Sequence, residues 1–168
     1  MVFRVETRFP YPPAVIFEYF SNLERRMIWD GHNYESLNQV KTYAMNTFIY
    51  LVQLKKQWPL GNRDLLLLFQ GLQTPDGSIY LASKSTEHPE FPAQAKSLRV
   101  ATKSGSFLFQ PEKEGRVTKF FYVTEFDFRG SLPRYVVQKA AQASFIDNIQ
   151  RLRKLLDKLE PAQSKYQG

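Results

Sequence analysis

The amino-acid sequence predicts an α+β fold in which a curved antiparallel β-sheet wraps around one long C-terminal α-helix, with two short helices after the first strand. Two short helical stretches follow an initial strand, the middle of the chain reads as strands and turns, and the last part repeats apolar residues every three or four positions. Because antiparallel sheets twist, a long apolar helix packs on such a sheet only if the strands curl around it.

The first strand is predicted at Val2–Phe9, where apolar and polar residues alternate. Three closely spaced prolines then end it, and proline is tolerated in the first turn of a helix, where its missing N–H has no helical partner. Ala14–Asn22 is therefore expected to form a short helix. Leu23–Trp29 is expected to form a second one, which Asp30-Gly31 ends.

The middle of the chain is predicted to form strands joined by tight turns. The continuous apolar run Leu65–Phe69 indicates a strand covered on both faces. The turn sequence Thr74–Gly77 predicts a hairpin, whereas the proline-containing stretch Thr86–Ser97 predicts a long loop of the kind that often forms a lid. The expected strands are Tyr34–Tyr43, Thr47–Lys55, Arg63–Leu72, Ser78–Ser85, Leu98–Thr102, Ser106–Gln110 and Arg116–Phe128.

The last helix is predicted to start near Ser131, a suitable N-cap residue, with Pro133 in its first turn. A helix of roughly 26 residues would be about 39 Å long. Residues 1–160 are expected to form one domain, and residues 161–168 a flexible tail. The apolar positions that define one face of this helix are Val137, Ala141, Phe145, Ile149, Leu152, Leu156 and Leu159.

Apolar residues make up 43% and aromatic residues 15% of the 168-residue chain. So many large rings fit either a Phe-rich core or a core with a second apolar surface, such as a cavity wall. The chain has no Cys, which excludes disulfides and thiolate nucleophiles. Its apolar runs are too short to cross a bilayer, and its first residues lack the pattern of a signal peptide. We therefore expect a soluble, cytoplasmic protein.

The formal charge of +7 is compatible with a nucleic-acid partner, an anionic membrane or a solvated surface. No short polybasic run with interleaved aromatic residues occurs, so we expect no nucleic-acid partner. Arg151, Arg153, Lys154 and Lys158 cluster in the last helix, where they form either a solvated helix face or a contact with an anionic membrane. We expect a monomer that meets membranes transiently.

Four stretches of the chain, in order, resemble the START lipid-transfer domain: RRMIWD (25–30), WPLGNRD (58–64), SLRVA (97–101) and DFRGSLPRYVV (127–137). The resemblance runs from about Val2 to Leu159 and implies the helix-grip fold. The extra N-terminal helix and two strands usual in START domains have no counterpart in the sequence. That difference predicts a shorter sheet, close to the core shared with birch-pollen-allergen and polyketide-cyclase relatives.

The resemblance to START domains implies a tunnel between the sheet and the last helix that holds one lipid. It further implies a lid formed by the loop Thr86–Ser97 and the end of the long helix, which opens at a membrane surface. The residues expected to form the lid and to meet the membrane are His88, Phe91, Arg151, Lys154 and Lys158.

Arg26 is the principal candidate for head-group binding. The resemblance implies that an Arg three residues before Trp29 meets a lipid phosphate, which suits a planar, permanently charged guanidinium. Alternatively, Arg26 pairs with Asp30 at i+4.

The remaining expected ligand contacts come mainly from the sheet and the last helix. Val52, Leu54 and Leu65 stand in the stretches where choline-binding relatives carry aromatic rings, so the resemblance predicts an apolar wall there. Arg99 is either a cavity cation or an exposed strand residue. The other expected contacts are Asp30, Tyr122, Val137, Ala141 and Phe145.

The sequence offers little for catalysis. Its two histidines, His32 and His88, both stand at turns, and no Ser-His-Asp arrangement or paired-His metal spacing is present. Arg63-Asp64 is expected to be a buried pair that fixes the start of a strand. We therefore expect a lipid-binding and transfer protein with no cofactor and no enzymatic activity. The alternatives are a carrier or sensor of a sterol or another apolar molecule, and a polyketide-cyclase-like enzyme.

Overall fold

The computed structural model describes residues 1–56, 61–130 and 133–159. The predicted N-cap Ser131 and the predicted tail 161–168 lie outside these ranges. The elements are β1 (Val2–Phe9), α1 (Pro13–Ser21), α2 (Leu23–Asp30), the 3-10 turn η1 (Gly31–Asn33), β2 (Tyr34–Ala44), β3 (Thr47–Leu54), β4 (Arg63–Gln73), β5 (Ile79–Ser85), β6 (Leu98–Arg99), β7 (Ala101–Glu112), β8 (Val117–Asp127) and α3 (Arg134–Leu159).

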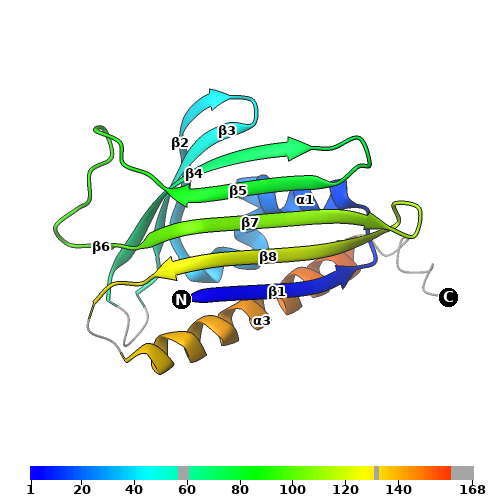
Figure 1. Ribbon diagram of the computed structural model, residues 1–168. Helices are drawn as coiled ribbons and strands as arrows, with labels where there is room; N and C mark the ends of the chain where they lie inside the picture. The colour runs from blue at the N-terminus through cyan, green and yellow to red at the C-terminus, as the bar shows by residue number, and fades with distance from the viewer. Residues whose placement is uncertain (57–60, 131–132, 160–168) are drawn as a thin grey trace.

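The eight strands form one curved sheet in the order β1-β8-β7-β5-β4-β3-β2, with β6 beside β4 (Figure 1). All neighbours along this order are antiparallel. The first and last strands pair along their whole length, from Val2 opposite Glu125 to Phe9 opposite Thr118. The predicted fold class is therefore confirmed: a curved antiparallel sheet holds a long C-terminal helix.

One strand prediction was wrong. The expected strand Leu98–Thr102 is two elements, because Leu98 and Arg99 pair in parallel with Arg63 and Asp64 at the start of β4. Strand β5 ends at Ser85, opposite Leu67, and so leaves the beginning of β4 without a neighbour on that side. β6 fills the gap, and the chain then enters β7.

A single residue, Asn22, separates the two short helices. Its backbone N–H donates to the Glu18 carbonyl and so ends α1. Its side-chain oxygen accepts from the Arg25 N–H at 3.1 Å and so caps α2. Because one residue serves both helices, α2 starts in a fixed position relative to α1, and this positions Arg26 in the first turns of α2.

The long helix α3 is held tightly at its two ends and loosely in its middle. Val137 near its start, and Leu152 and Leu156 near its end, are buried. Between them, the inward positions Phe145 and Ile149 are only half-buried. The curved sheet thus meets the helix at both ends and leaves space beneath its centre. Within the described residues, no helix is long and apolar enough to cross a membrane.

Arg63 and Asp64 are both buried, but they do not pair with each other as predicted. Side chains alternate along β4, so Arg63 points to the helix side and Asp64 to the outer face. Arg63 donates to the carbonyls of Gly61, Phe128 and Arg129, at 3.0 to 3.3 Å. It therefore ties β4 to the connection between β8 and α3.

We predict that Arg63→Met lowers the free energy of unfolding by about 2–3 kcal/mol, because the substitution removes the charged donor of three hydrogen bonds to backbone carbonyls. Urea denaturation measures this. Arg116→Met is the matched control, since Arg116 pairs with Glu114 at an exposed site and such pairs contribute less than about 1 kcal/mol. Equal losses for both variants would contradict the assigned role.

Candidate functional site

Two adjoining hollows lie between α3 and the sheet. The first, of about 180 Å³, lies among α2, α3 and the strands. The second, of about 170 Å³, lies beneath the first half of α3. The residues that line both are Tyr34, Leu54, Phe126, Phe128, Phe145 and Asn148. The shared wall indicates one interior space under the middle of the long helix.

Aromatic rings both fill the core and line this space. Phe20 of α1 packs its ring against Phe109 and Phe120 at centroid distances of 5.3 and 5.1 Å, which closes the interior at that end. Tyr122 stacks on Phe107 at 4.3 Å and faces the cavity. The high aromatic content therefore serves the core and a cavity wall together.

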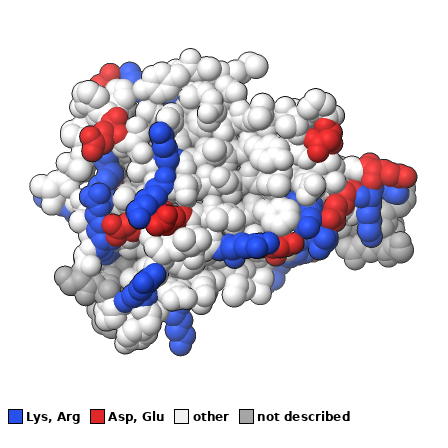
Figure 2. Space-filling view, in the orientation of Figure 1, with Lys and Arg blue, Asp and Glu red and all other residues white. Residues whose placement is uncertain are grey.

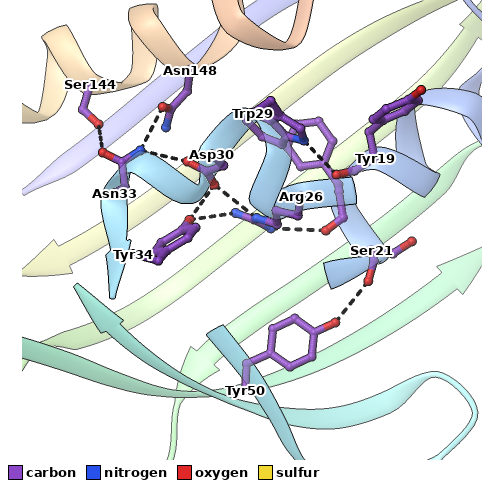
Figure 3. Close-up of polar contacts among 11 residues, drawn as sticks. Tyr19, Ser21, Arg26, Trp29, Asp30, Asn33, Tyr34, Tyr50, Ser144 and Asn148 are labelled. Carbon is purple, nitrogen blue, oxygen red and sulfur yellow. Dashed lines mark hydrogen bonds and ion pairs between the residues drawn. The ribbon is translucent and has the colours of Figure 1, made fainter. Parts of the chain in front are cut away.

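Arg26 is the only Lys or Arg among the described residues that line the first hollow. Its side chain is 15% exposed. It donates from Nε to Asp30 Oδ2 at 3.2 Å, and from its terminal nitrogens to the Phe20 carbonyl at 3.4 Å and the Tyr34 hydroxyl at 3.3 Å (Figure 3). The rings of Phe20, Trp29 and Tyr34 surround the guanidinium at 5.7 to 6.0 Å.

Asp30 compensates this buried charge. Its Oδ2 also accepts from the Tyr34 hydroxyl at 2.6 Å, and its Oδ1 accepts from Asn33 Nδ2 at 2.8 Å. Burial raises the pKa of the Tyr34 hydroxyl above its usual value, so this hydroxyl stays a donor to Asp30 at physiological pH. Arg26, Asp30 and Tyr34 form a closed cluster, which we call the polar cluster.

The polar cluster reaches α3 through Asn33. The Asn33 side chain donates to Asn148 Oδ1 at 2.9 Å and accepts from the Ser144 hydroxyl at 3.3 Å (Figure 3). Both partners lie in the middle of α3, where the helix is loosely packed. These polar contacts therefore link the position of the helix to the residues around Arg26.

Most predicted ligand contacts lie on the cavity wall. Residues that line the first hollow are Arg26, Asp30, Val52, Leu54, Leu65, Tyr122 and Phe145, and Val137 and Ala141 line the second. Arg99 lines neither. Instead, it binds Asp64 at 2.7 Å on the outer side of the sheet and donates to the Phe91 and Pro92 carbonyls.

Several wall residues were missed from the sequence. Tyr34 and Asn148 contribute polar groups, and Trp29 and Tyr50 contribute rings. Arg26, Asp30 and Tyr34 are four residues apart in sequence, a spacing that would bring their side chains together on one face of a helix. This spacing could have indicated the cluster, although Tyr34 begins a strand. Val52, Leu54 and Leu65 are indeed apolar, but rings from other positions surround the same space.

The loop Thr86–Ser97, which the sequence predicts to be a lid, does not cover the cavity. None of its residues lines either hollow. It is anchored by Lys41, whose Nζ binds Glu90 at 3.0 Å, and by Arg99. Side chains alternate along a strand, and Leu65 faces the cavity, so the neighbouring Asp64 lies on the outer face of the sheet. Arg99 binds Asp64 there, and the loop is therefore anchored on the outer face. His88 and Phe91 pack on each other in this loop, at a centroid distance of 5.3 Å.

The basic end of α3 lies far from this loop. Figure 1 shows the loop between β5 and β6 at one end of the molecule and the end of α3 at the other, so the expected proximity of Phe91 to the basic residues was wrong. Arg151 pairs with Asp147 at 2.7 Å, and Lys154 and Lys158 are exposed. The cause is the direction and length of α3, which starts at the end of the molecule where β8 finishes and runs to the opposite end (Figure 1).

The histidines lie away from the interior. His32 is 3.1 Å from Asp147 beside α3, and neither histidine lines a hollow within the described ranges. Within these ranges, no group of three or more His, Asp or Glu side chains has a metal-binding arrangement.

A curved antiparallel sheet that grips a long C-terminal helix over an apolar interior defines a helix-grip protein with a small-molecule cavity. The model of the START domain family matches residues 1–162. The chain therefore belongs to the START domain family.

Similar proteins include START domain-containing protein 10 of Mus musculus and of Homo sapiens, each 27% identical over 134 residues. The match covers 78% of this chain but only 44% of those proteins, so the chain spans less than half of their length. StAR-related lipid transfer protein 6 of Homo sapiens is 22% identical, with 88% of this chain and 68% of that protein covered.

Solved structures share the fold. Human StAR-related lipid transfer protein 5 superposes with a TM-score of 0.84 at 18% identity, covering 94% of this chain and 76% of that one. A lipid transfer protein fragment from Xanthomonas axonopodis gives 0.74 at 17% identity, covering 92% and 85%.

The Tyr122 hydroxyl on the cavity wall makes the stability of the protein depend on pH. Burial raises the pKa of Tyr122 to about 12, whereas an unfolded tyrosine ionises near 10. Between about pH 10 and 12 the unfolded chain therefore releases this proton more readily, and stability falls as pH rises. We predict that Tyr122→Phe weakens this loss. Chemical denaturation at pH 9 to 12 measures it, and equal slopes for both proteins would contradict the assignment.

Proposed function

We propose that the chain binds one lipid in the interior space beneath α3, favours a phospholipid, and carries it between membranes without covalent chemistry. The observation that supports this most is a guanidinium on the wall of a mainly apolar cavity. Three of the five N–H groups of Arg26 have partners within the described residues, which leaves two for a ligand. A phosphate oxygen suits such donors.

Charge balance favours a zwitterionic head group. Arg26 and Asp30 together carry no net charge, so a purely anionic ligand would bring one uncompensated charge into a buried site. A head group with one phosphate and one ammonium keeps the site neutral. Rings of the facing strands that line the same hollow, among them Tyr50 and Tyr122, can attract the ammonium through their faces.

The size of the interior indicates that it widens on loading. Each hollow is smaller than the roughly 300–1,000 Å³ of most small-molecule pockets. The middle of α3 forms one wall of this space, and its Phe145 and Ile149 are only half-buried. We expect this part of the helix to shift when an acyl chain enters.

A carrier of this kind needs no catalytic group. Exposing a methylene to water costs about 0.8 kcal/mol, so free desorption of a lipid with about 30 methylenes faces a barrier of about 24 kcal/mol if all of them are exposed. An apolar cavity replaces bilayer contacts with protein contacts and removes the aqueous step. The names of the relatives, several of them StAR-related lipid transfer proteins, agree with this proposal.

A transfer assay between donor and acceptor vesicles tests the proposal. The purified chain should accelerate the movement of a labelled phospholipid above the spontaneous rate, with zwitterionic head groups ahead of anionic ones. Cholesterol and oleic acid serve as comparison ligands. Faster transfer of cholesterol than of any phospholipid would favour a sterol carrier, and binding without transfer would favour a sensor. No binding of any of these lipids would overturn the proposal.

We predict that Arg26→Met lowers phospholipid affinity about tenfold or more and oleic acid affinity much less, because only the phospholipid loses its phosphate contact. Equilibrium titration with both ligands measures this. Removing Arg26 leaves the buried charge of Asp30 without its partner. The second variant therefore combines Arg26→Met with Asp30→Asn, which avoids a folding defect. An equal loss for both ligands in this double variant would contradict a head-group role.

We propose that the membrane contacts the end of the molecule where α3 begins. The second hollow lies under this half of the helix, next to the exposed Tyr135, and Arg129 and Arg134 line a neighbouring groove. Figure 2 shows Lys and Arg side chains at this end, interspersed with Asp and Glu side chains.

Each basic residue near an anionic bilayer contributes about 1 kcal/mol. Arg134→Glu with Lys139→Glu should therefore slow transfer from vesicles that contain phosphatidylserine about tenfold. Arg151→Glu with Lys154→Glu, at the opposite end of α3, is the matched control and should have a smaller effect. A larger effect of Arg151→Glu with Lys154→Glu would contradict this proposal and indicate that the basic end of α3 meets the membrane.

A further inference from the structure

One buried hydroxyl on the cavity floor has no hydrogen-bond partner. Thr102 of β7 is 3% exposed and lines the first hollow, yet its Oγ1 contacts no donor or acceptor in the described part of the chain. Its backbone N–H is satisfied by Ser85 Oγ at 2.7 Å. The strand register shifts between Thr102 and Ser104, and this irregularity lets Thr102 share the inner face with Phe107.

The other buried threonines of the sheet differ in this respect. Thr118 donates to the Tyr11 carbonyl at 2.7 Å, and Thr124 donates to the Ser104 carbonyl at 3.2 Å. Buried polar groups are nearly always paired, so an unpaired hydroxyl on a cavity wall calls for an explanation. A bound molecule that supplies the missing partner is such an explanation.

A second hydroxyl lies on the same floor. Ser83 of β5 lines the first hollow as well. It stands opposite Gly105 of β7. A Cβ at position 105 would lie 2.5 Å from Ser83 Oγ, so only glycine leaves room for this hydroxyl. The sequence therefore keeps space for a polar group on an apolar floor.

We propose that Thr102, assisted by Ser83, forms a second polar subsite that donates hydrogen bonds to an ester carbonyl oxygen of the bound lipid. The subsite rests on the proposed function and adds a chemical requirement to it. Arg26 and Asp30 come from α2, whereas Thr102 and Ser83 come from the facing strands. One lipid can therefore be held at its phosphate from one wall and at its acyl linkage from the other. The ligand class is an acyl ester lipid rather than an alkyl ether lipid.

The test compares two phosphatidylcholines that differ only in this oxygen. One carries two oleoyl chains in ester linkage, and the other carries the same chains in ether linkage, without carbonyl groups. The wild-type chain should bind the diester about tenfold more tightly than the diether. Thr102→Val keeps the shape of the side chain and removes the hydroxyl, so this preference should vanish while the affinity for the diether stays unchanged.

Thr124→Val is the matched control, because its hydroxyl already has a partner. It should lower the melting temperature but keep the ester preference. Thr102→Val should melt at the wild-type temperature or above, since no hydrogen bond is lost. Equal wild-type affinity for diester and diether overturns the subsite and leaves the lipid carrier intact. Failure to bind phosphatidylcholine or any other lipid of the transfer assay overturns the carrier itself.

Discussion

The structure depends on the mismatch between a long straight helix and a strongly curved sheet. The helix is buried near Val137 at its start and near Leu152 and Leu156 at its end, whereas Phe145 between them is half-buried and reaches the sheet through ring contacts with Phe3 and Tyr122. A twisted antiparallel sheet cannot follow a helix of 26 residues along its whole length. The interior space is therefore a consequence of the backbone geometry, and large rings fill it only at one end.

Placing a guanidinium in that space sets the second constraint. Arg26 is kept there by a carboxylate, a tyrosine hydroxyl and a backbone carbonyl. The same carboxylate connects through Asn33 to the middle of α3. Charge compensation and helix position are thus parts of one network, and a ligand that changes the partners of Arg26 also acts on the most loosely packed segment of the helix.

Local patterns predicted the elements, and most of the expected ligand contacts lie on the cavity wall. The helical period of α3 identified Phe145 as an inward position, whereas Val52 and Leu65 were placed by the resemblance to START domains. Long-range geometry could not be read in this way. Whether a loop crosses the inner or the outer face depends on anchors such as Lys41 and Arg99, which are distant in sequence. The parallel pairing of β6 has the same origin, because it depends on where β5 ends. Thr102 stands out only once its lack of a partner is visible.

The pairing of the first strand with the last has a consequence for biosynthesis. Each of the eight residues of β1 faces a residue of β8 that is at least 109 positions later, the smallest separation being that between Phe9 and Thr118. While the ribosome is still making the middle of the chain, β1 has no neighbour, and its partner emerges only shortly before α3. The N-terminal strand must therefore remain unpaired through most of translation, and such late, non-local closure slows folding and exposes the apolar face of this strand to chaperones.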